Sequence, residues 1–245
     1  MCWYRNILIN KNSISLNKLL RTLTESEFEK ISPHLHEVTL VSGAILHEAY
    51  EPIKVVYFPL TAMISLVSIM EDGSTTEIGL IGNEGMIGLP VFLGGEYSIS
   101  RAIVQMKGKS LKMSSDILVK EFQEAGALQK ILLLHTQARL TQIAQSAACN
   151  RQHKIEARLA RWLLSVYDCV LQDELDLTQE FISNMLGVRR AGVTIAAKAL
   201  QDKGIIRYNR GKIVILDHKK LEETSCECYK LVQKEFFRLL GSRRG

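Results

Sequence analysis

Two kinds of hydrophobic pattern divide the chain, and they predict a β-rich part followed by a helical part. Short apolar runs occupy residues 38–41, 55–58, 63–69, 77–81 and 102–106. Turn signals that contain glycine separate these runs, as at Ser42-Gly43 and Asp72-Gly73. Strands of this length and spacing are typical of an antiparallel β-barrel or jelly roll. We therefore predict an α+β fold whose N-terminal β-barrel domain covers residues 1–126.

The pattern becomes helical near residue 114, and residues 128–149 contain neither glycine nor proline. Leu133, Leu140 and Ala147 recur at intervals of seven. This heptad spacing suits a helix that pairs with a copy of itself, although a helix packed on its own barrel would show it too. We predict a dimerisation helix over residues 127–150. Its predicted contacts are Leu133, Leu140, Ile143 and Ala147.

The remaining residues, 151–245, are predicted to form one C-terminal domain. A helix over residues 155–170 is indicated by an apolar stripe that includes Leu159 and Trp162. The last stretch, residues 219–240, is predicted to be a terminal helix that packs on this domain.

Between these two helices, the residues are spaced as in two short helices joined by a tight turn. Thr178 is a good N-cap for a helix over residues 179–186, and Gly187 can adopt the positive φ that ends it. A second helix is predicted over residues 189–203. Ser183 is small where the two helices must cross closely. This combination is typical of a helix-turn-helix, although an ordinary αα-hairpin can also show it.

A basic hairpin follows the second helix. Residues 205–216 form two short apolar runs around an Asn209-Arg-Gly211 turn. A hairpin in this position is typical of a winged helix-turn-helix.

Positive charge is concentrated in the same part of the chain. The whole chain has a formal net charge of +5, and residues 151–245 contain 18 Lys and Arg against 12 Asp and Glu. The C-terminal part therefore carries a net charge of +6, and the rest carries −1. Such asymmetry is expected where the C-terminal part binds a polyanion, and we predict double-stranded DNA as the partner.

The predicted DNA contacts fall into three groups. An arginine on the outward face of the second helix can bind guanine O6 and N7, and Arg190 is the strongest candidate. The N-terminus of the first helix offers N–H groups to a phosphate. Basic residues of the wing would contact the DNA backbone without reading sequence. The full set is Thr178, Gln179, Arg189, Arg190, Thr194, Lys198, Arg207, Arg210 and Lys212.

No catalytic or metal site is predicted. The sequence has neither a Gly-x-Ser-x-Gly elbow nor a phosphate-binding Gly-Lys-Ser/Thr loop, so we do not expect an enzyme. His34 and His36 could begin a cupin-like metal site, but no later set of His and Glu completes it. Cys226 and Cys228 form a Cys-x-Cys pair. Residues two apart on a helix point to different faces, so we expect inert thiols there, with no metal and no cofactor.

Signals for the membrane are also missing from the sequence. No apolar run approaches the roughly 18 residues of a membrane span. The first ten residues lack the apolar core and cleavage site of a signal peptide. We expect a cytoplasmic protein that does not bind a membrane.

The order of these parts closely resembles the superfamily of the cyclic-AMP receptor protein and the fumarate–nitrate reductase regulator (CRP/FNR). The resemblance covers about residues 17–240. It implies a bacterial transcription regulator that binds two-fold symmetric DNA as a homodimer, with recognition helices roughly 34 Å apart, and RNA polymerase as a further partner. Besides the helix-turn-helix, it rests on Glu51-Pro-Ile53, Val56-Tyr-Phe-Pro59, Met70-Glu-Asp-Gly-Ser74, Gly82-Asn-Glu-Gly-Met-Ile-Gly88 and Arg101-Ala-Ile-Val-Gln105.

The ligand pocket departs from the members that bind cyclic nucleotides. Those members carry Gly-Glu for the ribose and Arg-Ser/Thr for the phosphate, whereas this chain has Gly88-Leu89 and Arg101-Ala102. The two positions that contact adenine correspond to Ile143 and Ala144, which have no polar side chain. Each buried hydrogen bond left unmade costs about 1 kcal/mol or more. We therefore expect a degenerate pocket without tight binding of cyclic AMP, and the effector stays unassigned.

Other sensors of this superfamily are also disfavoured. Cys2 is the only cysteine before the predicted dimerisation helix, which is too few for an iron–sulfur cluster near the barrel. Nothing specific favours a haem on His34, His36 or His47. In the recognition helix, Ala191 and Ile195 replace the Glu and Arg of familiar members, so we expect a different operator sequence.

Two other functions are compatible with parts of the pattern. One is a ligand-binding module that acts through protein partners and leaves DNA alone; the other is a cupin-like metalloenzyme with a helical appendage. For the regulator, we expect a signal in the barrel to reorient the dimerisation helix and so move the paired recognition helices. Constitutive DNA binding, controlled through the abundance of the protein, is the alternative.

Overall fold

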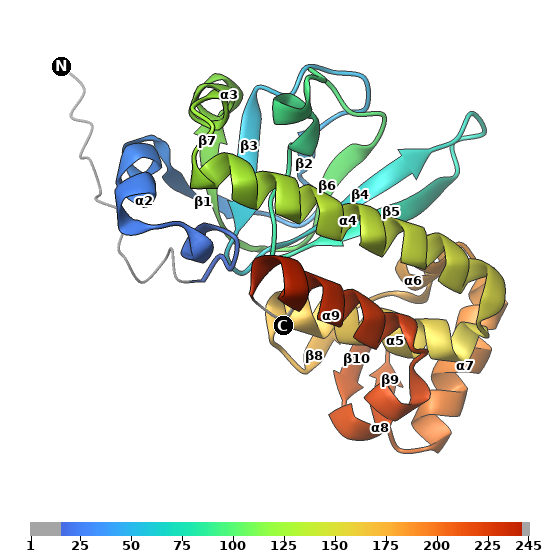
Figure 1. Ribbon diagram of the computed structural model, residues 1–245. Coiled ribbons are helices and arrows are strands. Elements are labelled where there is room, and N and C mark those ends of the chain that lie inside the picture. Colours follow the sequence, from blue (N-terminus) through green and yellow to red (C-terminus); the bar gives the residue numbers. More distant parts are fainter. Residues whose placement is uncertain (1–15, 242–245) are drawn as a thin grey trace.

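Two antiparallel sheets form the N-terminal part of the computed structural model, which describes residues 16–241 (Figure 1). One sheet has the order β1-β7-β3, with β1 at His36–Leu40, β7 at Gly108–Ser114 and β3 at Val55–Pro59. The other has the order β2-β6-β4-β5. Its strands are β2 (Ile45–His47), β6 (Arg101–Met106), β4 (Met63–Ile69) and β5 (Thr75–Ile81). Every neighbouring pair of strands is antiparallel.

Five of these strands coincide with the predicted runs, and two were missed. β2 is only three residues long. β7 pairs with both β1 and β3 and is central in its sheet, yet Leu111 and Met113 are its only large apolar residues. Its position is fixed by backbone pairing, so no apolar run marks it. At its start, a Cβ on Gly108 would lie 2.5 Å from the backbone nitrogen of Ala62, which leaves room only for glycine.

Short helices flank the two sheets. They are η1 (Leu20–Thr22), α2 (Glu25–Ile31), η2 (Ser32–His34), η3 (Leu89–Leu93) and α3 (Ser115–Gln123). Just before α2, the side chain of Thr24 donates a hydrogen bond of 2.8 Å to Glu27. The other carboxylate oxygen of Glu27 accepts the backbone N–H of Ala127, the first residue of helix α4 (Ala127–Gln152). A side chain 100 residues away therefore caps that helix.

Two longer helices connect the N-terminal sheets to the C-terminal part. Helix α4 spans Ala127–Gln152 and runs beside the N-terminal sheets, and α5 spans Ile155–Val170 (Figure 1). The final helix, α9 (Cys228–Leu240), packs along α4. His153 and Lys154 have extended backbone angles and separate α4 from α5.

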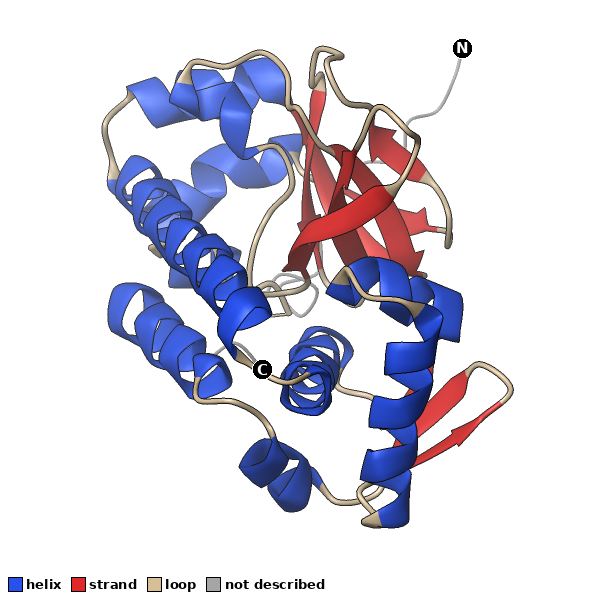
Figure 2. Cartoon of the chain, turned by 90° about the vertical axis from the view of Figure 1, so that its right-hand side faces the viewer, coloured by secondary structure: helices blue, strands red, loops and turns tan. Residues whose placement is uncertain are grey.

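The C-terminal part contains two short helices and a small sheet. Helix α6 spans Gln179–Leu186 and α7 spans Arg190–Asp202. The sheet has the order β8-β10-β9, with strands at Glu174–Asp176, Lys212–Ile215 and Ile206–Asn209. Figure 2 shows this sheet set apart from the N-terminal sheets, with helices between them. Strand β8 was not predicted from the sequence.

The predicted terminal helix over residues 219–240 is wrong in one respect, because the chain is not helical throughout. Helix α8 ends at Thr224, and α9 begins at Cys228. Ser225 between them is extended, with φ −68° and ψ 158°. Its hydroxyl donates to the carbonyl of Glu222, which helps to end α8.

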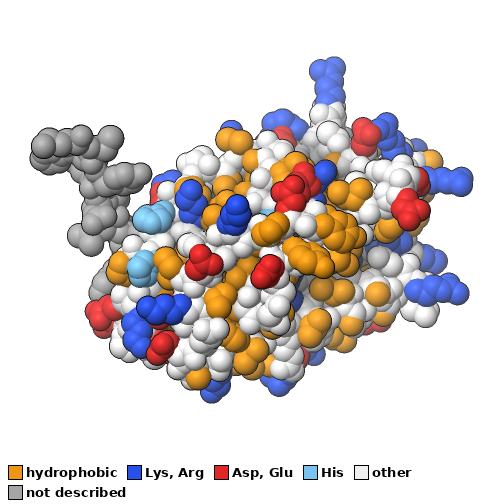
Figure 3. Space-filling view, turned by 90° about the horizontal axis from the view of Figure 1, so that it is seen from above, with side chains coloured by type: hydrophobic (Ala, Val, Ile, Leu, Met, Phe, Trp, Pro, Cys, Tyr) orange, Lys and Arg blue, Asp and Glu red, His pale blue; other side chains and the backbone are white. Residues whose placement is uncertain are grey.

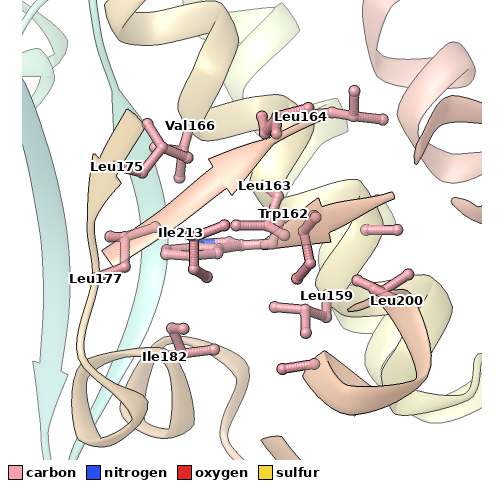
Figure 4. Close-up of a cluster of buried hydrophobic side chains, with 14 of the residues drawn as sticks. Leu159, Trp162, Leu163, Leu164, Val166, Leu175, Leu177, Ile182, Leu200 and Ile213 are labelled. Atoms are coloured by element: carbon pink, nitrogen blue, oxygen red, sulfur yellow. The ribbon is translucent and has the colours of Figure 1, made fainter. Parts of the chain in front are cut away.

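The largest hydrophobic core joins the N-terminal and C-terminal parts. It contains Trp162 and Leu163 from α5, residues of α6 and α7, and the wing strands (Figure 4). Met63 of β4 and Leu80 of β5 belong to the same cluster. Two further clusters lie within the N-terminal part, one of which also includes residues of α4 and α9.

The surface carries both apolar and charged groups. Figure 3 shows hydrophobic side chains interrupting the charged surface on the face seen from above, with Lys and Arg at its edges. Among residues 16–241, no helix is long and apolar enough to cross a membrane. The predicted α+β fold, with N-terminal antiparallel sheets and a C-terminal helix-turn-helix, is confirmed.

Candidate nucleic-acid interface

Local capping fixes both ends of α6. The hydroxyl of Thr178 accepts the backbone N–H of Phe181 at 3.1 Å, as an N-cap should. Gly187 adopts φ +60° at the other end, and the N–H of Val188 donates to the carbonyl of Ser183 at 3.0 Å. The turn between α6 and α7 therefore follows from short-range signals that the sequence shows directly.

The two helices pack through a compact apolar seam. Ile182 and Leu186 of α6 and Val193 and Leu200 of α7 are all buried. Ser183 is 6% exposed at the crossing, and its hydroxyl donates to the carbonyl of Glu180. This packing leaves the opposite face of α7 to solvent.

The outward face of α7 carries the predicted recognition residues. Arg190, Thr194 and Lys198 are four residues apart, so they share one face, and all three are exposed. Arg190 forms an ion pair of 2.5 Å with Glu180 of α6. The hydroxyl of Thr194 lies 3.3 Å from the side-chain oxygen of Gln179. The first turn of α7 and the N-terminus of α6 are therefore neighbours, which brings these predicted contact residues together.

Ile195 lies on the exposed side of α7 as well, with 71% of its side chain accessible. An apolar side chain in this position can contact the methyl group of thymine. Arg189 is the N-cap residue of α7 and is exposed.

The turn of the wing meets the start of α6. The backbone N–H of Leu177 donates to the carbonyl of Gly211 at 2.7 Å, and the hydroxyl of Tyr208 donates to the carbonyl of Leu177. Arg210, at the tip, has φ +48° and is exposed. The wing tip and the N-terminus of α6 therefore form one continuous edge.

Two further basic residues lie on the wing strands. Arg207 is exposed, and Lys212 forms ion pairs with Glu174 at 2.6 Å and Asp176 at 3.7 Å. The hydrogen bond with Glu174 raises the pKa of Lys212. Because both carboxylates are paired with the ammonium group of Lys212, Lys212 is less available to a phosphate than Arg210 is.

Comparisons with known proteins agree with this geometry. Residues 157–224 match the Crp-like helix-turn-helix domain family. We refer to this segment as the Crp-like domain. The match favours a helix-turn-helix over an ordinary αα-hairpin for α6 and α7. No curated protein matches the chain in sequence.

Several solved structures share the fold. FixK2 from Bradyrhizobium japonicum has a TM-score of 0.67 at 16% identity, covering 78% of this chain and 98% of its own. A CRP/FNR-family transcriptional regulator from Thermus thermophilus has a TM-score of 0.63 at 22% identity, covering 78% and 98%. The c-di-GMP-responsive regulator CLP from Xanthomonas campestris has a TM-score of 0.65 at 14% identity, covering 79% and 100%. At these identities the likeness shows the fold, and the predicted resemblance to the CRP/FNR superfamily is confirmed. The match to the Crp-like domain family supports a DNA-binding regulator.

The predicted dimer positions lie outside the Crp-like domain, on the exposed side of α4. Leu133, Leu140 and Ile143 are 46%, 62% and 42% exposed, and Ala147 is exposed too. The other side of α4 packs on the sheets and on α9 through residues such as Leu132 and Ala138. Exposed apolar side chains that gather on one side of a helix are typical of interaction sites.

The predicted ligand-pocket positions are only partly brought together. Arg101 of β6 forms an ion pair of 2.7 Å with Glu48, so a phosphate would have to displace a carboxylate there. Ala102 is fully buried and pairs with His47 and Leu66. Ile143 and Ala144 are exposed on α4.

Gly88 precedes η3 with φ +109°. A Cβ at this position would lie 2.7 Å from the side chain of Val56, so the glycine has a structural role. Leu89 begins η3 and packs, partly buried, on the core of the N-terminal part.

The candidate histidines of the N-terminal part are separate. His34 ends η2 and His36 opens β1; both are exposed. His47 is 9% exposed on β2, and burial lowers its pKa. Cys2 lies outside the described residues.

Two buried arginines with structural roles were missed by the sequence reasoning. Arg158 of α5 donates to the carbonyl of Leu186 at the end of α6. Arg139 of α4 is 3% exposed and donates to the carbonyl of Leu80 at 2.8 Å. In the sequence each reads as one more surface charge on an amphipathic helix, and only the tertiary fold reveals its carbonyl partner.

The expectation about Cys226 and Cys228 rested on a helix that is absent at this point. Cys226 lies between α8 and α9, and Cys228 is the first residue of α9. The argument that helical geometry separates their side chains therefore does not apply.

Proposed function

We propose that the chain is a homodimeric, sequence-specific DNA-binding transcription regulator. The observation that carries this proposal is the exposed face of α7 in a Crp-like domain, where Arg190 and Thr194 adjoin the N-terminus of α6 and Lys198 follows on the same face. Arg190 would exchange its ion pair with Glu180 for a base edge in the major groove, and the capped α6 would orient its first N–H groups toward a phosphate. Arg210 at the wing tip would bind the backbone beside that phosphate.

Dimerisation is supported by the apolar stripe on α4. Leu133 and Leu140 are about half exposed and seven residues apart, which suits pairing of this helix with its copy across a two-fold axis. Two copies related in this way would present two α7 helices to successive turns of the major groove.

Signal control would pass through direct contacts between the N-terminal sheets and the Crp-like domain. The carboxylate of Glu77 in β5 accepts from Ser65 at 2.7 Å and from the indole N–H of Trp162 at 3.3 Å. The hydroxyl of Ser65 also lies 3.9 Å from the sulfur of Met185 in α6. We propose that a signal in the barrel would reach α6 and α7 through these side chains. The ion pair of Arg101 with Glu48 argues against cyclic AMP as that signal.

The decisive experiment is selection of bound sequences from a random duplex library, with and without cyclic AMP. We expect an inverted repeat with half-sites about 10–11 base pairs apart, unchanged by the nucleotide. Affinity for the selected site should fall steeply as salt rises, since phosphate neutralisation releases counterions.

Two variants complete this experiment. Arg190→Ala should lose about 1–3 kcal/mol of discrimination at one base position of each half-site. Lys219→Ala, an exposed lysine on α8, is the matched control and should bind as the parent does. Folded protein without salt-dependent affinity for any duplex would refute the proposal and favour a ligand-binding module that acts through protein partners.

A further inference from the structure

Four potential metal ligands converge at the junction between α4 and the C-terminal part. Cys149 lies in the last turn of α4, and His153 follows the end of that helix. Cys226 and Cys228 come from the connection between α8 and α9. One ligand atom from each residue can be chosen so that all four lie within 4.8 Å of one another.

The spacing of these atoms suits a single tetrahedral ion. The sulfurs of Cys149 and Cys226 are 3.4 Å apart, and the sulfur of Cys228 is 3.6 Å from Nδ1 of His153. Around zinc, bond lengths near 2.3 Å to sulfur and 2.0 Å to nitrogen place tetrahedral donors about 3.5–3.8 Å apart. The ligands of an iron–sulfur cluster bind different irons and would be more widely separated.

The three thiols are enclosed. Cys149, Cys226 and Cys228 are 0%, 6% and 1% exposed and form a cluster of their own, with Ala157 packed against it. Buried cysteines are often inert core residues, but such residues have no need of a histidine beside them. Here the imidazole of His153 supplies a fourth potential ligand beside the three thiols.

Groups around the cluster are arranged as in the outer shell of a metal site. Nε2 of His153 lies 3.2 Å from the carboxylate of Glu227, which would fix the tautomer that leaves Nδ1 for a metal. The side-chain amide of Gln145 donates to the sulfur of Cys228 at 3.0 Å. Such N–H···S bonds stabilise a thiolate.

We propose that Cys149, His153, Cys226 and Cys228 bind a zinc ion through three thiolates and Nδ1 of His153. Four protein ligands close the coordination shell, so the site is structural and offers no position to a substrate. The ion holds the end of α4 to the start of α9, at the point where α4 gives way to α5. This assignment does not depend on the proposed function.

The first test is the metal content of the full-length protein, purified without an affinity tag and under reducing conditions. We expect about one zinc ion per chain by plasma mass spectrometry. Cys228→Ser and His153→Ala should each lower this stoichiometry. Cys169→Ser, which changes a buried cysteine outside the cluster, is the matched control and should retain the zinc.

A second measurement needs no variant and therefore does not depend on how the substitutions fold. The parent protein, stripped with a chelator and titrated with Co²⁺, should develop the thiolate-to-cobalt absorption of a tetrahedral site and lose it when zinc is added. Folded protein that binds neither ion would overturn the proposal. Iron with acid-labile sulfide, or a Cys149–Cys226 disulfide found by mass spectrometry in place of bound zinc, would overturn it as well.

Discussion

Arg210 occupies a backbone conformation that arginine rarely adopts. Its φ is +48°, and Gly211 after it has φ +81°, so both central residues of the wing turn are left-handed. Such turns strongly favour Asn-Gly, because Asn tolerates this region better than a long side chain does. An unfavourable residue at the tip of a basic wing suggests that its charge matters more than the ease of the turn.

We therefore expect Arg210→Asn to separate stability from DNA binding. The free energy of unfolding should stay unchanged or rise by up to about 1 kcal/mol, because the turn is relieved. The affinity for DNA should fall about equally for all sequences, and the slope of log affinity against log salt should shrink by about one. Thermal unfolding and binding titrations at several salt concentrations measure both effects. An unchanged salt slope would remove Arg210 from the interface, and Lys219→Asn controls for loss of charge elsewhere.

At the scale of the element, the two faces of α4 differ in whether they are buried or exposed. One face contributes Leu128 and Leu132 to the core of the N-terminal part, whereas Leu140 is 62% exposed. One face of α4 is therefore packed within the chain, whereas the other leaves apolar side chains exposed to solvent.

Leu140→Glu should convert the protein to a monomer without unfolding it, since a charge in an apolar seam is poorly tolerated while the same residue in water is harmless. Analytical ultracentrifugation gives the mass, and circular dichroism checks the fold. DNA affinity for an inverted repeat should drop by more than tenfold, because two half-sites are then no longer bound together. Ile99→Glu places the same change at a residue that is 66% exposed in the loop before β6, and it should leave the dimer intact. A dimeric Leu140→Glu protein would argue against this seam.

The elements that could be predicted from the sequence are those that local signals define. Thr178, Gly187 and the apolar spacing between them define α6 almost completely. Strand β7 and the cluster of Cys149, His153, Cys226 and Cys228 could not be predicted from the sequence, since each depends on residues that are distant in the chain. Cys149 and Cys226 are 77 residues apart, and nothing in the sequence between them indicates that they meet. Ser225 alone hinted that the terminal helix would be interrupted, because serine competes with a helix for backbone hydrogen bonds.

At the scale of the whole molecule, the hairpin formed by β4 and β5 touches the Crp-like domain. Thr76 lies against the turn at Gly187, and Trp162 of α5 is hydrogen-bonded to Glu77. The outward face of α7 is exposed in this arrangement, so we expect it to be the state that binds DNA.

Glu77→Gln tests this coupling. A neutral amide keeps the volume of the side chain but weakens the hydrogen bonds from Ser65 and Trp162, which a carboxylate accepts more strongly. We expect a loss of DNA affinity of roughly 2- to 30-fold, the range for coupling energies of about 0.5–2 kcal/mol, with the preferred sequence unchanged. A shift in the fluorescence of Trp162 should accompany it. Glu48→Gln makes the same chemical change beside Arg101 and should not affect DNA binding. Equal effects of both variants would show that the contact between Glu77 and Trp162 does not specifically couple the N-terminal sheets to the Crp-like domain.

The core shared between Met63, Leu80 and α5 also bears on how such a chain can evolve. Domains joined by a solvated linker can be exchanged by recombination, since neither half needs the other to bury its surface. Here the sheets complete the hydrophobic interior of the DNA-binding half. A foreign DNA-binding domain grafted after α4 would leave Met63 and Leu80 in water unless its own surface matched them. Operator preference in this lineage is therefore expected to diverge by point substitutions on α7 and not by exchange of whole domains.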